Sequence, residues 1–224
     1  MSHTSSIAGS DAVFDAMCKQ VGIIRATETV QIFDMAEALV HLPLPPGNRV
    51  GIIGSGGQGV VVSDNCEMLG LKVPALDMDT RLRLKQALPP HAPVPSNPID
   101  FAGGNRSAED EARIVDALAQ IDYIDGIIAN APSFRSGGGD SADSARSGIA
   151  GAEMMASIPR KYGKPVVTLR FSGGGGRGGG RDILGYIIRD AGIPTFDTPE
   201  QCVRAMWAVM EYARIRRQLG EDKR

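Results

Sequence analysis

Residues 49–53 read Arg-Val-Gly-Ile-Ile, residues 54–59 read Gly-Ser-Gly-Gly-Gln-Gly, and a helix-forming run follows over residues 60–69. A β-branched run that enters a glycine turn and leaves as a helix predicts the first strand, loop and helix of a parallel α/β sheet. Glycines have no Cβ and adopt positive φ, so this turn can bring backbone N–H groups close to an anion at the positive end of the helix. A tight turn without a ligand explains the same residues, and the spacing matches neither GxGxxG nor a Walker A loop.

The composition limits the class of protein. The chain has 224 residues, 42% of them apolar, and a formal net charge of −2. That length suits one large domain or one domain with an appendage, and the charge provides no global field that favours nucleic acid. No apolar run approaches the ~20 residues that span a bilayer, and no secretory leader is visible. We therefore expect a cytoplasmic protein that binds neither nucleic acid nor a membrane.

The cysteines and histidines point to no metal or disulfide framework. The three cysteines form no CxxC pair, which favours a reducing cytoplasm and thiols that fill the core. The three histidines show no ligand spacing with one another or with a cysteine, so we expect no metal site. These residues are Cys18, Cys66, Cys202, His3, His41 and His91.

Strands alternate with helices along the chain, which predicts an α/β fold with a doubly wound, mostly parallel sheet of about six strands. The expected strands cover residues 21–25, 49–53, 72–76, 98–101, 125–131, 164–170 and 193–196. Some expected helices are identified by their caps, at Asp11, Thr27, Ser107 and Thr198, and the helix after Thr198 runs to about residue 219. Others cover residues 79–88, 149–162 and 181–191. A proline-bearing linker over residues 41–48 divides the chain into an N-terminal extension, 1–47, and a main domain, 48–224.

Three glycine-rich loops follow expected strands. They cover residues 54–59, 136–139 and 172–180, the second within a polar loop over residues 133–147. Because the carboxyl ends of parallel strands share one edge of a sheet, we expect these loops to gather on one side, where helix N-termini point. Arg177 in the third loop and Arg181 directly after it are candidates to bind a phosphate, although a mobile loop explains them as well.

The start of the chain carries a family resemblance. Residues 2–11, Ser-His-Thr-Ser-Ser-Ile-Ala-Gly-Ser-Asp, closely resemble the phosphohistidine segment of NDP-forming (ADP-forming) acyl-CoA synthetases, the group related to succinyl-CoA ligases. Ser5 and Ile7 replace the Gly and Leu of the usual segment. The likeness covers essentially the whole chain in the same order, through residues 22–25, 48–59, 96–100 and 191–200.

The resemblance implies a phosphohistidine segment within residues 1–47 and a flavodoxin-like ligase domain over residues 48–224. It implies part of an enzyme, as a subunit or a fragment, that converts a carboxylic acid, CoA and ATP to acyl-CoA, ADP and phosphate through acyl phosphate. His3 is then the catalytic nucleophile, transiently phosphorylated. Imidazole suits this task because it is largely neutral near pH 7 and has a free nitrogen lone pair.

The resemblance also assigns the loops. The loop at Ser136, Gly137, Gly138 and Gly139 resembles the one whose helix N-terminus steadies the phosphohistidine. The loop at Ser55, Gly56 and Gly57 resembles the one that lines the carboxylate substrate. Gly54 stands where the family often has an asparagine and an extra residue, so this loop is shorter than usual.

The resemblance further implies partners. The family's CoA-binding lobe and ATP-grasp module have no counterpart here, and we expect them on separate subunits or on other parts of the same polypeptide, with Mg²⁺ on the ATP-grasp module. CoA, ATP or ADP and a small carboxylic acid are then substrates of an assembled oligomer that is inactive without these modules. Two alternatives remain: a non-catalytic scaffold or dimerisation domain of the same fold, and a CoA or acyl transferase that uses no nucleotide.

Overall fold

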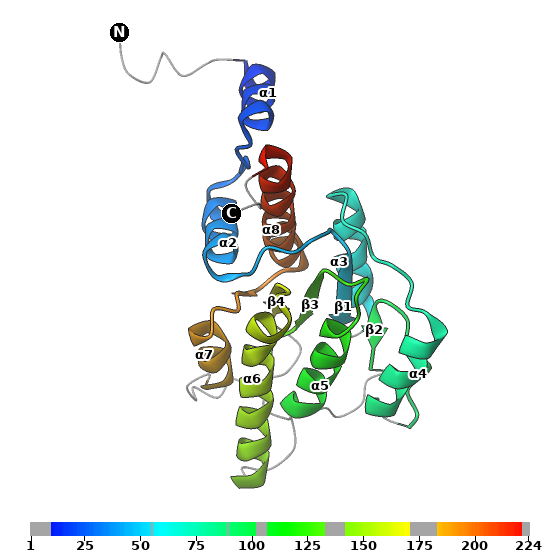
Figure 1. The fold of residues 1–224 in the computed structure, drawn as a ribbon. Helices are drawn as coiled ribbons and strands as arrows, with labels where there is room; N and C mark the ends of the chain where they lie inside the picture. Colours follow the sequence, from blue (N-terminus) through cyan, green and yellow to red (C-terminus); the bar gives the residue numbers. More distant parts are fainter. Residues whose placement is uncertain are drawn as a thin grey trace.

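The computed structural model describes residues 10–54, 56–88, 90–101, 107–132, 142–170 and 183–220. In these residues, parallel strands form one sheet in the order β2-β1-β3-β4-β5 (Figure 1). The strands are β1 (Val50–Gly54), β2 (Ile99–Asp100), β3 (Gly126–Asn130), β4 (Val166–Leu169) and β5 (Thr195–Phe196). The helices are α1 (Asp11–Val21), α2 (Thr29–His41), α3 (Gly57–Met68), α4 (Met78–Ala87), α5 (Ala108–Ala119), α6 (Ala142–Tyr162), α7 (Ile183–Asp190) and α8 (Pro199–Leu219).

Helices cover both faces of the sheet. On one face, buried side chains of α4, α5, α6 and α7 form a core with Ile53, Ile127 and Val166. On the other face, buried side chains of α2, α3 and α8 form a second core with Ile52 and Ile128. The alternation of successive strand residues between the two cores is the pattern of a strand that is buried on both sides. The predicted doubly wound, flavodoxin-like fold is confirmed.

Two expected strands are wrong. Helix α1 continues to Val21, and Gly22 ends it with a φ of 76°. Residues 23–25, the rest of the strand predicted over residues 21–25, belong to no strand. Residues 72–76 contribute only a bridge from Lys72 to Arg49. Pro74 has no N–H to donate to a ladder, which explains why pairing stops there. The described sheet therefore has five strands rather than about six.

Helix starts follow the predicted caps in the main domain. Ser107 and Asp110 form a capping box at the start of α5, and Thr198 caps α8 directly before Pro199. Thr27 is wrong as a cap, because its hydroxyl and N–H instead donate to Gln31 Oε1 and α2 begins at Thr29. Helix α6 begins at residue 142 rather than 149, so the polar loop before it is shorter than predicted.

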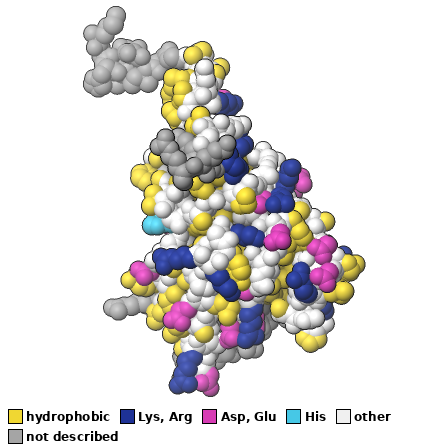
Figure 2. All heavy atoms as spheres, viewed as in Figure 1, with side chains coloured by type: hydrophobic (Ala, Val, Ile, Leu, Met, Phe, Trp, Pro, Cys, Tyr) yellow, Lys and Arg dark blue, Asp and Glu magenta, His cyan; other side chains and the backbone are white. Residues whose placement is uncertain are grey.

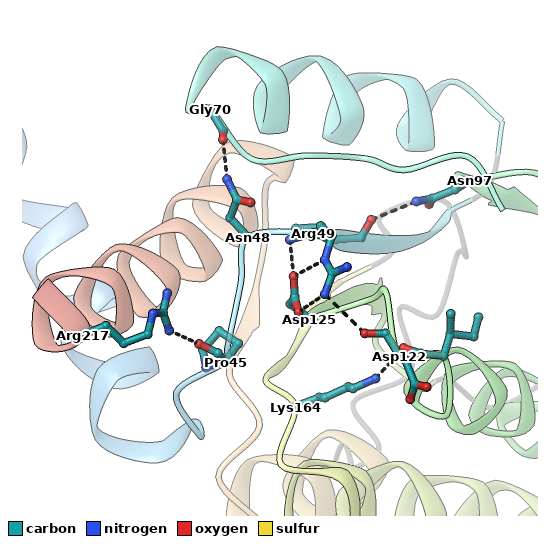
Figure 3. Close-up of polar contacts among 11 residues, drawn as sticks. Pro45, Asn48, Arg49, Gly70, Asn97, Asp122, Asp125, Lys164 and Arg217 are labelled. Carbon is teal, nitrogen blue, oxygen red and sulfur yellow. Dashed lines mark hydrogen bonds and ion pairs between the residues drawn. The ribbon is translucent and has the colours of Figure 1, made fainter. Parts of the chain in front are cut away.

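Polar side chains form hydrogen bonds on both sides of β1 (Figure 3). The amide of Asn97 accepts from the Ile52 N–H and donates to the Val50 carbonyl, each at 2.9 Å, so it replaces a neighbouring strand at this edge. On the other side, Arg49 pairs with Asp125, whose side chain is only 1% exposed. Burial opposes ionisation of Asp125, but hydrogen bonds from the Arg49 guanidinium and backbone N–H outweigh it and hold the pKa of this carboxyl below its usual value.

Helix α2 lies beside α8, and α1 extends beyond the end of α8 (Figure 1). Gln201 on α8 donates to Asp34 on α2 at 3.1 Å, and Ala38 is fully buried between them and the sheet. The boundary near residue 48 stays a prediction. The cysteines Cys18, Cys66 and Cys202 are free and buried, as predicted for core thiols. None of the helices in the described ranges is long and apolar enough to cross a membrane.

Candidate functional site

The strand order defines one favoured place for a ligand. Strand β1 connects to β2 on one side and β3 returns on the other, so the direction of winding reverses between β1 and β3. In open α/β sheets, ligands bind outside the carboxyl ends of the strands at such a switch point. The glycine turn after β1 starts at this point, and the chain leaves β3 and its neighbour β4 from the same edge. The strand ends that precede all three predicted loops are therefore adjacent.

The glycine turn is close-packed against the start of α3. A Cβ on Gly54 would lie 2.9 Å from the Cα of Gly59, and a Cβ on Gly59 would lie 3.1 Å from the Cβ of Pro98. Gly56 has a φ of 52°, which favours glycine, and leads directly into the helix. Glycine is thus required at position 54 because backbone approaches backbone there, and it is favoured at position 56 by the positive φ and at position 59 by the nearby Pro98 side chain.

The N-terminus of α3 is open to an anion. Its N-cap is Gly56, which has no side chain to accept from the first helical N–H groups, and its first turn contains no acidic residue. Gly56 and Gly57 are exposed, and a Cβ on either would meet no atom within 4 Å. Unsatisfied N–H groups together with the helix dipole favour negative charge at this position.

Asn130 is a residue of this site that the sequence analysis missed. It is the last residue of β3 and is only 3% exposed. Within the part of the chain that the structure describes, neither its Oδ1 nor its Nδ2 has a hydrogen-bond partner. A buried amide without partners is costly and requires an explanation, such as a ligand.

The register shows where Asn130 lies. Strands β1 and β3 pair from Val50 opposite Gly126 to Ile52 opposite Ile128. The same offset, extended by two residues along both strands, places Gly54 level with Asn130. Asn130 follows Ile128 by two residues, so its side chain lies on the face that α3 and α8 cover. Gly54 has no side chain on that face, and its missing Cβ would point at the first turn of α3. The amide of Asn130 therefore lies beside the glycine turn.

A second unpartnered group lies at the start of α3. Gln58 lies in the first turn of α3, and its Oε1 is buried without a hydrogen-bond partner among the described residues. Farther along the same edge, Arg170 follows β4 and pairs with Asp197 after β5, so its charge is partly neutralised. Within the described ranges, no group of three His, Cys, Asp or Glu side chains is arranged to hold a metal ion.

The structure places only part of the predicted site. Gly56 and Gly57 lie at the N-terminus of α3, beside the switch point. The other predicted site residues lie outside the described residues: His3, Ser55, Ser136, Gly137, Gly138 and Gly139. The third glycine loop with Arg177, and Arg181 directly after it, also lie outside them. The roles of these residues stay predictions.

Comparison with known proteins decides the family. A succinyl-CoA ligase like flavodoxin domain matches residues 1–39, and a ligase-CoA domain matches residues 49–128. Together these models cover more than half of the chain. The chain belongs to the ADP-forming acyl-CoA synthetase and succinyl-CoA ligase family. This confirms the resemblance that the sequence motifs indicated.

Relatives of this family member match it over nearly its whole length. The alpha subunit of acetate–CoA ligase [ADP-forming] II from Pyrococcus furiosus is 33% identical over 221 residues, which cover 95% of this chain and 44% of the relative. Acetate–CoA ligase [ADP-forming] II from Archaeoglobus fulgidus is 30% identical, over 96% of this chain and 30% of the relative. The crystal structure of PH0766 from Pyrococcus horikoshii matches with a TM-score of 0.72 and 29% identity, over 93% of this chain and 45% of that one. The chain thus spans less than half the length of these relatives.

Proposed function

We propose that this chain is part of an ADP-forming acyl-CoA synthetase and provides the phosphohistidine and one wall of the site where acyl phosphate forms and reacts. The observation that carries the proposal is the open, glycine-lined N-terminus of α3 at the switch point of a sheet that belongs to this family. Such a helix end stabilises a phosphoryl or carboxylate anion through its N–H groups.

His3 carries the phosphoryl group in this proposal. Its imidazole nitrogen attacks the γ-phosphorus of ATP on the nucleotide module, and ADP leaves. The phosphohistidine then transfers the phosphoryl group to a carboxylate oxygen of the acid, which gives acyl phosphate and restores the free imidazole. The CoA thiolate attacks the acyl carbon, the carbon–oxygen bond to phosphate breaks, and acyl-CoA and inorganic phosphate leave.

Other modules complete the enzyme. CoA and ATP bind to a CoA-binding lobe and an ATP-grasp module, the latter with Mg²⁺, and the reaction needs both to meet this chain. The coverage of the relatives, of which this chain spans less than half, supports such modules. So does the surface of α1 and α2, where several large apolar side chains are exposed and uncovered (Figure 2). The most exposed of them are Val13, Val21, Val30, Ile32, Phe33 and Val40.

The alternatives make different predictions. A scaffold that has lost the cycle assembles with the other modules but takes up no phosphate. A CoA or acyl transferase without nucleotide exchanges CoA between acids in the absence of ATP. No described residue favours either alternative over the synthetase, because both use the same fold and the same exposed surfaces.

The experiment is an acyl-CoA synthesis assay with the assembled enzyme. Acetate, CoA and ATP serve as substrates, and wild type is compared with His3→Asn and with the control His41→Asn, an exposed histidine outside the site. We expect His3→Asn to abolish acetyl-CoA formation and His41→Asn to leave it unchanged. Formation at the wild-type rate by His3→Asn would refute the proposed role.

A further inference from the structure

We propose that Asn130 and Gln58 recognise inorganic phosphate in a protonated form and thereby distinguish it from fully deprotonated anions of the same shape. This inference rests on the proposed function only in that phosphate is a reaction product there. The residues themselves are identified by their unpartnered groups.

Asn130 presents one donor, Nδ2, and one acceptor, Oδ1, and Gln58 presents a second acceptor, Oε1. An anion that only accepts hydrogen bonds would satisfy Nδ2 and the helix N–H groups but would leave both carbonyl oxygens unpaired. The ligand that satisfies the set must therefore both accept and donate.

Near neutral pH, inorganic phosphate has two or three unprotonated oxygens that accept hydrogen bonds and at least one P–OH group that donates. The N–H groups at the start of α3 and Asn130 Nδ2 suit the unprotonated oxygens. Asn130 Oδ1 and Gln58 Oε1 suit the P–OH groups. Sulfate has the same size and shape but carries no proton at this pH, so it cannot satisfy either carbonyl.

A buried amide that pairs with nothing destabilises the folded chain, and its replacement by an apolar side chain of similar size removes that penalty. Asn130 should therefore lower the stability of the free chain and strengthen its binding of phosphate. Asn97 is the matched control, because its amide is fully paired: it accepts from the Ile52 N–H and donates to the carbonyls of Val50 and Pro74.

The test uses the full chain, with inorganic phosphate and sulfate as probes in calorimetric titrations and with thermal unfolding of the same samples. Wild type should bind phosphate at least tenfold more tightly than sulfate. Asn130→Leu should raise Tm by a few degrees, weaken phosphate binding at least tenfold and lose the preference over sulfate. The control Asn97→Leu should lower Tm. Asn130→Asp, which keeps the shape but exchanges the donor for an acceptor, should also lose phosphate binding.

Three results would overturn the inference: equal affinity of wild type for the two anions, no phosphate binding at millimolar concentration, or a fall in Tm in Asn130→Leu. Its failure is separable from that of the proposed function. If His3 carries no phosphoryl group while the anion preference holds, the synthetase proposal fails and this inference stands. If His3 is phosphorylated while phosphate and sulfate bind alike, the reverse is true.

Discussion

The guanidinium of Arg49 donates two hydrogen bonds to the Asp125 carboxylate, from Nε at 2.7 Å and from Nη2 at 2.9 Å (Figure 3). The backbone N–H of Arg49 donates a third to the same carboxylate at 2.9 Å. Arg49 directly precedes β1 and Asp125 directly precedes β3. The pair therefore joins the two strands that flank the switch point, at the edge of the sheet opposite the candidate site. Gly47 packs against it so closely that a Cβ there would lie 2.3 Å from Asp125 Oδ2.

Loss of Arg49 should destabilise the fold. Arg49→Ala leaves a carboxylate that is 1% exposed without its cation, and we expect a loss of about 3 kcal/mol in the free energy of unfolding. That figure is at the low end for a buried pair because the Arg49 side chain is itself 39% exposed. Urea unfolding at pH 7 measures it. The control Arg83→Ala removes an exposed pair with Asp79 and should cost under about 0.5 kcal/mol; equal losses in the two variants would contradict the account.

The stability of the chain should fall in acid. The pKa of Asp125 is lowered in the folded state, and backbone and side-chain hydrogen bonds from Thr80 and Tyr123 lower the pKa of Asp77 to about 2. A lowered folded pKa contributes stability that is fully present above the unfolded value of about 3.9 and is lost as the pH falls through the folded value. Unfolding free energy should therefore decrease from about pH 4 down to about pH 2. Asp125→Asn should flatten this slope, and an unchanged slope would show that Asp125 does not contribute to it.

The two ends of the glycine turn should differ in how well they tolerate substitution by alanine. Gly54→Ala puts a Cβ 2.9 Å from the Cα of Gly59, where backbone must move, so we expect a loss of about 1–3 kcal/mol and weaker phosphate binding. Gly57→Ala puts its Cβ in open space at the first residue of α3 and should be neutral or slightly stabilising. Thermal unfolding and phosphate titration of both variants measure this difference. A stable Gly54→Ala chain with unaltered phosphate affinity would show that the turn is not constrained as described.

The buried thiols should resist modification. Burial raises the pKa of Cys66 to about 12 and raises that of Cys202 further above its usual value, while Cys18 is only 2% exposed. Because the thiolate is the reactive form, a disulfide reagent such as DTNB should react slowly with the native chain at pH 8 and rapidly with all three cysteines after denaturation in guanidinium. Fast reaction of any native thiol would show that its part of the core opens readily.

Much of the architecture could be predicted because local sequence signals agree with the tertiary packing. The apolar runs before Gly54 and Asn130 fill strands buried on both faces, and Ser107 and Thr198 cap helices where the pattern placed them. The strand predicted over residues 21–25 failed because strand formation depends on a neighbour that supplies hydrogen bonds, and sequence preference alone does not provide one.

The candidate site could be predicted only in part. Glycines at positions 54, 56 and 59 indicate the turn in the sequence because close packing or a positive φ favours glycine at each position. Asn130 gives no such signal: in the sequence it is one polar residue at the end of an apolar run, which is an ordinary way for a strand to end. Its importance depends on burial and on the absence of partners among the described residues, and both are properties of the folded chain.

Trapping the phosphorylated intermediate shows whether His3 carries the phosphoryl group. The chain is incubated with its CoA-binding and ATP-grasp modules and ATP labelled at the γ-phosphate, and the label is located by mass spectrometry after digestion. We expect acid-labile, base-stable phosphate on His3 that disappears when acetate and CoA are added, and no label in His3→Asn. Label on another residue, or an equal amount in His3→Asn, would contradict it.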